Sequence, residues 1–153
     1  GLAEERLIGA CQYLSQAQLS FDLTLRFVKE RNIFGKKIAD FQNTQFKLAE
    51  LRSDLDIAQT FVDQCVAAQN ASLLTPVDAA KAKYHTSELQ VRAAALGVQL
   101  HGGAGYMDEY AISRQYTDAA ISPIYAGTSE VMKLLISRDI MKDDYDPFNV
   151  RNF

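Results

Sequence analysis

Apolar side chains recur every three or four positions over most of the chain, which is the spacing that places them on one face of an α-helix. Charged and amide side chains occupy the opposite face, as expected for helices half-buried in a bundle. The positions that form these stripes are Leu7, Ala10, Leu14, Ala17, Phe21, Leu25 and Val28 in a first segment, Leu48, Leu51, Leu55, Ala58, Val62 and Cys65 in a second, and Val77, Ala80, Tyr84, Val91, Ala94 and Val98 in a third. A last, shorter stripe lies around Val131, Leu135 and Arg138.

Residues that end or cap helices separate the stripes. The predicted boundaries are Gly35 at the end of the first helix, Asn43 or Thr44 as the N-cap of the second, Thr75-Pro76 at the start of the third and the glycine cluster 102–105 at its end, and Thr128 at the start of the last. A short additional helix is expected at about 109–119. The sequence thus predicts an all-α fold, an up-down-up-down four-helix bundle with a short extra helix. Residues 1–141 would form this domain, followed by a loosely ordered tail, 142–153.

Composition narrows the class of protein without changing this fold. The chain has 153 residues, the size of one domain, and its net charge of −3 argues against a nucleic-acid or membrane-surface partner. It begins with Gly1 rather than Met and carries no signal or transit segment, which predicts a non-secreted fragment of a longer protein. Cys11 and Cys65 lie among apolar residues and are predicted to be buried free thiols in a reducing compartment.

Two kinds of ligand site common in such folds are argued against by the residues. A di-metal bundle site needs Glu-x-x-His pairs, but the only histidines, His85 and His101, are preceded at that spacing by Ala82 and Val98. We therefore predict no metal. The glycine cluster 102–105 follows a helix rather than a strand, so a helix C-cap explains it better than a Rossmann loop.

The segment 31–37 has two interpretations. Arg31, Lys36 and Lys37 could simply complement the negative end of the first helix dipole. Alternatively, Arg31 could bind a phosphate through two hydrogen bonds, with the ring of Phe34 packed beside the ligand. This segment alone favours the first interpretation.

Three motifs, taken in order, resemble the C-terminal domain of acyl-CoA dehydrogenases. They are Arg-x-x-Phe-Gly-Lys with Phe-Gln (31–42), Gln-Leu-His-Gly-Gly-x-Gly-Tyr-Met-x-Glu-Tyr (99–110) and Ile-Tyr-x-Gly-Thr-Ser-Glu (124–130). Each motif is weak alone, but their shared order and spacing are specific. The likeness runs from about residue 2 to residue 141 and is closest to the long-chain branch.

The resemblance implies a flavoprotein oxidoreductase of fatty-acid or branched-chain acyl oxidation. Members oxidise acyl-CoA to trans-2-enoyl-CoA: a carboxylate takes the α-proton while hydride passes from the β-carbon to flavin N5 of FAD. Electrons then pass to an electron-transfer flavoprotein. Members form homo-oligomers, dimers or tetramers, in the bacterial cytoplasm or the mitochondrial matrix.

The resemblance also implies which residues would contact FAD and substrate. Arg31, Phe34 and Gln42, with Gln99, Gly102 and Gly103, would contact the FAD of a neighbouring subunit. Thr128 and Glu130 would reach the subunit's own FAD, and Arg6 and Gly127 would lie near the thioester. A helix N-terminus at Thr128 suits a phosphate, although a plain N-cap is equally compatible with it.

The catalytic base is where this chain departs from the commonest family pattern. Many members carry Glu between the Tyr and Gly of the last motif, where this chain has Ala126. A smaller group places its Glu on the first helix, immediately before an Arg, and Glu5-Arg6 matches that position. Glu5 is therefore the candidate base, although Glu4 and Glu5 could also be first-turn acids favoured by the helix dipole.

A competing hypothesis is a non-catalytic homologue or a helical oligomerisation or interaction module. It is favoured by Ala126 and by 117–120, where Thr117 and Ala120 replace the family's usual basic residues. This fragment alone would be inactive because other domains are missing. The whole enzyme is nevertheless favoured by the joint presence of Glu5, Arg31, Gln42, Gln99 and Thr128.

Overall fold

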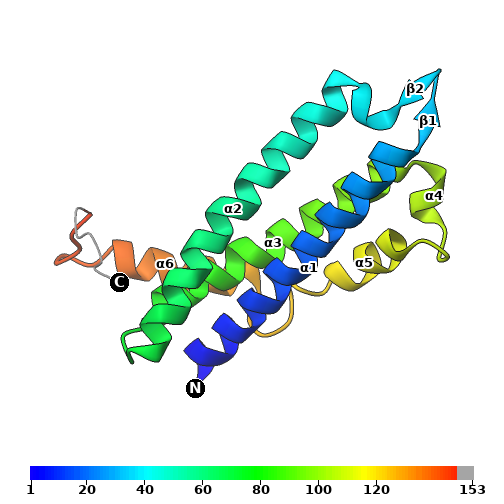
Figure 1. Cartoon of the computed structure of the whole chain (residues 1–153). Helices are drawn as coiled ribbons and strands as arrows, with labels where there is room; N and C mark the ends of the chain where they lie inside the picture. The colour runs from blue at the N-terminus through cyan, green and yellow to red at the C-terminus, as the bar shows by residue number, and fades with distance from the viewer. Residues whose placement is uncertain (148–153) are drawn as a thin grey trace.

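The chain folds as a bundle of three long helices with three shorter ones. The computed structural model describes residues 1–147. The elements are α1 (Leu2–Glu30), β1 (Asn32–Ile33), β2 (Lys36–Lys37), the 3₁₀ turn η1 (Ile38–Asp40), α2 (Gln42–Asn70), α3 (Pro76–His101), α4 (Gly103–Tyr106), α5 (Ala111–Ala119) and α6 (Ser129–Ile140). In Figure 1 the long helices α1, α2 and α3 run side by side, and the β1–β2 hairpin stands at one end. The predicted all-α fold is confirmed.

The core lies where α1 and α2 pack against α3. Most of the stripe positions predicted on α1 and α2 are buried, and Leu14 and Leu55 are almost completely withdrawn from solvent. Burying such a leucine side chain stabilises a fold by roughly 1.5–3 kcal/mol. These two stripes therefore supply much of the apolar contact that holds the bundle together.

The stripe predicted on α3 is shifted relative to the buried face. Val77, Tyr84 and Val91 are only half-buried, whereas the face buried along the helix includes Lys83, Thr86, Ser87 and Gln90 besides several alanines. The physical reason is that α3 is central and contacts α1, α2, α5 and α6. A helix covered on several sides has no single apolar stripe, so hydrophobic spacing cannot locate its buried face.

Two boundaries differ from the prediction. Gly35 does not close α1, which ends at Glu30. Instead Gly35 lies in the turn of the β1–β2 hairpin, in which Asn32 pairs with Lys37 and Ile33 with Lys36 in antiparallel register. The N-cap of α2 is Phe41 rather than Asn43 or Thr44, because the turn of η1 leads directly into the helix. The connection 31–41 between α1 and α2 holds a two-residue strand pair and a single 3₁₀ turn, and each is too short for a hydrophobic pattern to reveal.

Three other helix ends lie where the sequence predicts them. Thr75 caps α3 by accepting a hydrogen bond from the Asp78 N–H, and Thr128 caps α6 by accepting one from the Val131 N–H. Gly102 ends α3 with a positive φ of 63°. The following glycines then form the short helix α4, which the sequence did not indicate.

The last helix packs on α3 with a different residue from the predicted stripe. Met132 is fully buried, whereas Val131 is exposed, so the contact face is displaced by one position. The first part of the predicted tail, 142–147, contains no helix. The rest, 148–153, lies outside the described residues.

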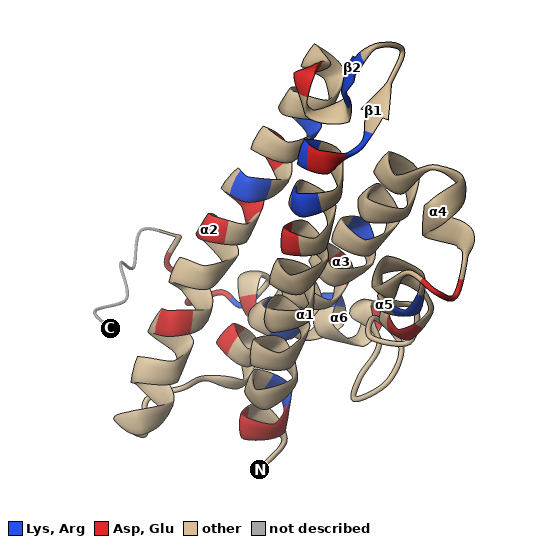
Figure 2. Ribbon diagram, turned by 45° about the vertical axis from the view of Figure 1, so that its right-hand side comes forward, with Lys and Arg blue, Asp and Glu red and all other residues tan. Residues whose placement is uncertain are grey.

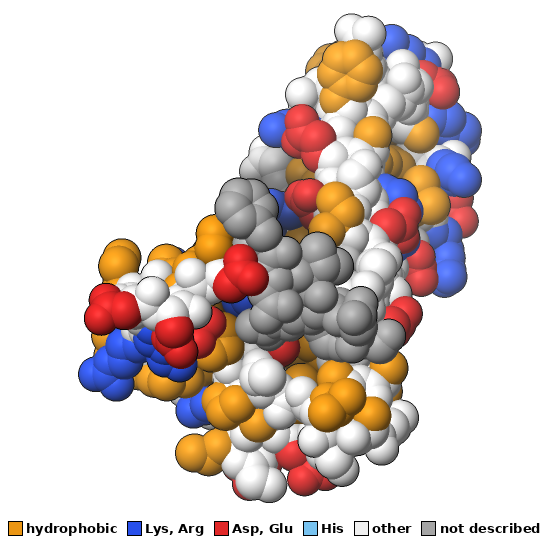
Figure 3. Space-filling view, turned by 90° about the vertical axis from the view of Figure 1, so that its left-hand side faces the viewer, with side chains coloured by type: hydrophobic (Ala, Val, Ile, Leu, Met, Phe, Trp, Pro, Cys, Tyr) orange, Lys and Arg blue, Asp and Glu red, His pale blue; other side chains and the backbone are white. Residues whose placement is uncertain are grey.

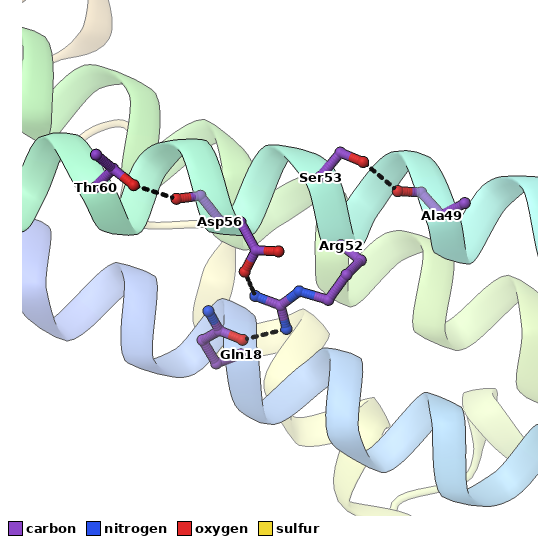
Figure 4. A network of polar contacts seen from close by, with 6 residues as sticks. All are labelled: Gln18, Ala49, Arg52, Ser53, Asp56 and Thr60. Atoms are coloured by element: carbon purple, nitrogen blue, oxygen red, sulfur yellow. Dashed lines mark hydrogen bonds and ion pairs between the residues drawn. The ribbon is translucent and has the colours of Figure 1, made fainter.

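A polar network joins α1 to α2 on the outside of the bundle. The Arg52 guanidinium donates to Gln18 Oε1 at 2.9 Å and to Asp56 Oδ1 at 2.6 Å (Figure 4). It also lies over the Phe21 ring. Because Gln18 and Phe21 belong to α1 and Arg52 to α2, the Arg52 side chain fixes the two helices relative to each other.

None of the described helices is long and apolar enough to cross a membrane.

Candidate functional site

The first turns of α1 and the loop before α6 meet in space. Glu5 is exposed and its neighbour Arg6 is half-buried. A side chain at Gly127 would place its Cβ 3.9 Å from Arg6 Nε, so the two backbone segments are in contact through this arginine. Arg6 Nε is buried and has no hydrogen-bond partner among the described residues. A buried donor left unpaired costs about 1–3 kcal/mol, so the geometry suits a ligand that accepts this hydrogen bond.

The loop that Arg6 touches is conformationally strained. Ala126 and Gly127 are consecutive residues with positive φ, 55° and 96°. For alanine this left-handed backbone costs on the order of 1–3 kcal/mol. At Gly127 a Cβ would lie 2.7 Å from Met132 Cε, so the buried Met132 side chain would have to shift to admit it. Backbone strain of this kind persists only where the surroundings impose it, and it clusters at functional sites.

Lys83 is a functional candidate that the sequence reasoning missed. Its side chain is completely buried, and its Nζ donates to the carbonyl oxygens of Ser122 at 2.8 Å and Gly127 at 2.5 Å. Burial lowers the pKa of Lys83, and the nearby Arg6 charge lowers it further. The available signal was its spacing, because Ala79, Lys83 and Gln90 share one face of α3, and all three are buried.

Two tyrosines complete this cluster. The ring centroids of Tyr13, on α1, and Tyr125, in the loop, are 5.9 Å apart, and Lys83 Nζ lies 5.8 Å from the centroid of the Tyr13 ring. Burial raises the pKa of the Tyr13 hydroxyl well above its ordinary value, and a hydrogen bond with Tyr125 adds to this shift. The cluster therefore links α1, α3 and the loop through two tyrosine rings and the Lys83 side chain.

The second predicted group of residues gathers at the opposite end of α1. Arg31 is exposed directly after the helix, Phe34 is 94% exposed in the hairpin turn, and Gln42 begins α2. Figure 2 shows Lys and Arg at the hairpin, where Lys37 Nζ also donates to the Glu30 carbonyl at 3.0 Å. An exposed aromatic ring beside exposed cations fits the ring and phosphate of a dinucleotide.

The end of α3 belongs to this same group. The His101 ring stacks on Phe27 of α1 with centroids 4.1 Å apart, which brings the C-terminal ends of both helices together. Gln99, Gly102 and Gly103 are exposed there. The structure therefore brings the residues predicted from the first two motifs to one end of the bundle.

The residues predicted from the third motif lie at the start of α6. Thr128 is half-buried and Glu130 exposed. The Ser129 N–H is bound by the Pro123 carbonyl at 2.9 Å and the Val131 N–H by Thr128 Oγ1 at 3.2 Å. Thr128 is thus a structural N-cap, and only part of this helix end is available to a phosphate.

At the remaining predicted or excluded positions the outcomes are simpler. Cys65 is buried and Cys11 half-buried; burial raises the pKa of the Cys11 thiol, with the Asp63 charge adding to it. Within residues 1–147 no three His, Cys, Asp or Glu side chains are grouped as metal ligands. His85 is exposed and His101 is the last residue of α3. At 117–120, where the two basic residues are missing, the Thr117 hydroxyl bonds the Ser113 carbonyl instead.

A groove of about 690 Å³ lies between α2 and α3, away from both groups. Its walls are formed by Ile57, Phe61, Val62, Leu89 and other residues of these helices. None of the predicted site residues lines it. The groove therefore does not belong to the candidate site.

We expect His101 to make the stability of the chain depend on pH. Burial lowers the pKa of His101, although the hydrogen bond from its ring to the Gly97 carbonyl acts in the opposite direction. Near pH 6.5, His101 therefore binds a proton in the unfolded state but remains neutral in the folded state. Stability is complete above this pH and falls as the pH drops toward the folded-state pKa.

The measurement is urea unfolding at about pH 7.5 and about pH 5.5, a range above the ordinary carboxylate pKa values. His101→Phe keeps the ring stacked on Phe27 and should lose most of the difference between the two pH values. His85→Gln, at an exposed position, should behave like the parent chain. An unchanged pH dependence in His101→Phe would show that other groups cause it.

Comparisons with known proteins show the family of this chain. The chain matches the family model described as acyl-CoA dehydrogenase, C-terminal domain, over residues 1–141. It is 46% identical over 142 residues to the mitochondrial long-chain specific acyl-CoA dehydrogenase of Sus scrofa, covering 93% of this chain and 33% of the relative.

Solved structures of acyl-CoA dehydrogenases have the same fold over this chain. An acyl-CoA dehydrogenase from Geobacillus kaustophilus superposes with a TM-score of 0.90 at 41% identity, covering 92% of this chain and 37% of that one. Butyryl-CoA dehydrogenase from Megasphaera elsdenii superposes with a TM-score of 0.89 at 32% identity, with the same coverage. The chain thus spans about a third of the length of these relatives.

Proposed function

Because the chain belongs to the acyl-CoA dehydrogenase family, as its C-terminal domain, we propose that the whole protein oxidises acyl-CoA to trans-2-enoyl-CoA. The observation that carries this proposal is the contact between the first turns of α1 and the strained loop at 126–127. This contact supports one site that would include both positions where the family carries its base, those of Glu5 and Ala126. A carboxylate is present at one of them.

We assign the removal of the substrate α-proton to Glu5. Ala126 has only a methyl group and cannot accept a proton, whereas Glu5 is exposed on α1 beside Arg6. A carboxylate at this position would face a ligand bound between α1 and the loop. The small side chain at position 126 would leave space where the other carboxylate stands in many relatives.

Arg6 and Gly127 would bind the thioester end of the substrate. The unpaired Nε of Arg6 offers a buried hydrogen-bond donor, and the missing side chain at Gly127 lets a ligand approach the backbone. The relatives named for long-chain substrates favour a long acyl chain, oxidised in the mitochondrial matrix or the bacterial cytoplasm.

Two separate FAD sites would involve each copy of this chain. When bound, FAD accepts the hydride that leaves the substrate β-carbon. Thr128 and Glu130 would contact the flavin nucleotide of their own subunit, and Arg31, Phe34, Gln42, Gln99, Gly102 and Gly103 that of a neighbour. At a rise of 1.5 Å per residue, α1 separates Glu5 from Arg31 by about 40 Å. A single dinucleotide cannot span this distance, so the arrangement supports a homo-oligomer.

The surface is consistent with contacts beyond this domain. Figure 3 shows hydrophobic side chains in several separate patches among charged ones, and Leu2, Ile8, Ile57 and Leu73 are each more than half exposed. Exposed apolar area of this kind fits contacts with the other domains, with further subunits and with an electron-transfer flavoprotein as electron acceptor.

The proposal is tested on the purified full-length protein. We expect a yellow flavin spectrum that is bleached by palmitoyl-CoA without oxygen, and more weakly by butyryl-CoA. A protein that holds FAD but whose flavin spectrum is bleached by neither thioester would favour the non-catalytic homologue. Ala126, Thr117 and Ala120 are the residues that support that alternative.

We further expect Arg31→Ala to weaken FAD binding more than it weakens the fold. A charge-assisted hydrogen bond contributes about 1.5–3 kcal/mol, whereas an exposed cation at a helix end contributes about 0.3–1 kcal/mol to the helix. Titration of the full-length apoprotein with FAD measures the first effect and thermal unfolding the second. Lys29→Ala, which removes another exposed cation from the last turn of α1, is the control. Equal FAD affinities in the parent and in Arg31→Ala would mean that Arg31 only complements the negative end of the α1 helix dipole.

A further inference from the structure

Lys83 is an unusual residue to find in this core. Its side chain is fully buried, yet its ammonium bonds only two backbone carbonyls and forms no ion pair with a carboxylate in residues 1–147. Withdrawing a charge from water costs several kcal/mol, and buried charges are normally paired. The nearest cation, Arg6, increases this cost. A methionine of similar volume would fill the same space without it.

The two carbonyls that Lys83 binds bracket the strained loop. Ser122 and Gly127 stand on either side of Ile124, Tyr125 and Ala126. Ser87, one turn later on α3, holds the same end of the loop, because its carbonyl accepts from Ser122 Oγ at 3.2 Å. The left-handed conformation of Ala126 is thereby enclosed between two points fixed to α3.

The bond to Gly127 also sets the direction of a backbone donor. In a planar trans peptide the C=O and N–H groups point in opposite directions. Because the Gly127 carbonyl is directed inward at Lys83, the N–H of the same peptide, which belongs to Thr128, is directed away from Lys83. This N–H has no acceptor among the described residues.

We propose that Lys83 is a positioning residue, which holds the Gly127–Thr128 peptide so that the Thr128 N–H is presented to the phosphate of the bound flavin nucleotide. The inference rests on the proposed function, because it takes the nucleotide to lie at the start of α6. Lys83 itself does not touch the nucleotide. It acts through the orientation of one peptide plane and through the loop on which Gly127 also approaches Arg6.

The test replaces Lys83 in the full-length protein by methionine. Replacing a buried charge by an apolar side chain of similar volume is often neutral or stabilising, so Lys83→Met should unfold at the parent's temperature or above it. Its FAD dissociation constant should nevertheless rise by about tenfold or more, the effect of losing a hydrogen bond to a charged group. Lys81→Met, on the same helix but half-exposed, should change neither quantity.

Hydrogen exchange separates positioning from a general structural role. In Lys83→Met we expect faster exchange in the peptide that contains 122–128, with unchanged protection in the core of α1 and α2. If the methionine variant does not fold, Lys83→Leu, which also lacks an N–H donor, takes its place in the same measurements.

Three outcomes would overturn the inference: unchanged FAD affinity in a folded variant, a loss of affinity matched by a loss of thermal stability, or faster exchange throughout the molecule. A parent protein that binds no FAD would instead contradict the proposed function. The two failures are therefore distinguishable.

Discussion

Glu5→Gln in the full-length protein is expected to abolish dehydrogenation while leaving the FAD content and acyl-CoA binding nearly intact. The amide retains the shape of the side chain but cannot accept the α-proton at neutral pH. Loss of a positioned general base costs about 10²–10⁴-fold in rate, and no second carboxylate stands at position 126 to replace it. The turnover number with palmitoyl-CoA and the flavin absorbance are the two measurements.

Two variants control this experiment. Glu4→Gln should matter little, because successive residues of a helix point about 100° apart. Glu5→Gln combined with Ala126→Glu should recover part of the activity by restoring a carboxylate at the family's other position. The backbone strain is the same for Ala and Glu, since both carry a Cβ. More than about a tenth of the parent turnover in Glu5→Gln would refute the assignment.

Gly97→Val is expected to cause the largest loss of stability. Gly97 lies on the buried face of α3, where a Cβ would meet Ile112 Cδ1 of α5 and come within 2.7 Å of Thr24 Oγ1 of α1. Thr24 cannot easily yield, because its hydroxyl bonds the Ser20 carbonyl at 2.7 Å. Overpacking of this kind costs about 1–3 kcal/mol, and contacts from two sides place the cost near the upper end.

The measurement is the midpoint of urea unfolding, followed by circular dichroism. Gly103→Val is the matched control, because a Cβ at Gly103 would meet no atom within 4 Å. It should unfold close to the parent midpoint. Equal midpoints for the two valine variants would mean that α5 moves away without cost, and that the contact between α3 and α5 is not tight.

The sequence predicted the helices best where one face alone is buried. On α1 and α2 the spacing of apolar residues identified the buried side chains, and two threonine caps located the starts of α3 and α6. The spacing of apolar residues did not identify the buried face of α3, because a central helix has neighbours on several sides and buries polar residues as well. Lys83 was therefore overlooked: only its acceptors, 39 and 44 residues further along the chain, explain why an amine is buried.

The residues of the candidate site could be predicted from family motifs but not from the spacing of apolar and polar residues. Nothing in the spacing of Arg6 and Gly127 indicates that they meet, since α2 and α3 lie between them in the chain. The resemblance to a family supplied that expectation. The unpaired Nε of Arg6 and the left-handed Ala126 are properties of three-dimensional packing, so no one-dimensional pattern could contain them.

The placement of the two candidate groups at opposite ends of α1 has a consequence for inheritance. If each copy provides the base of its own site and the nucleotide contacts of its neighbour's, two different inactive copies can complement each other. A subunit defective at Glu5 joined to one defective at Arg31 would form one site with both defects and one site with neither. A cell that carries both alleles would keep a working enzyme that neither allele encodes alone.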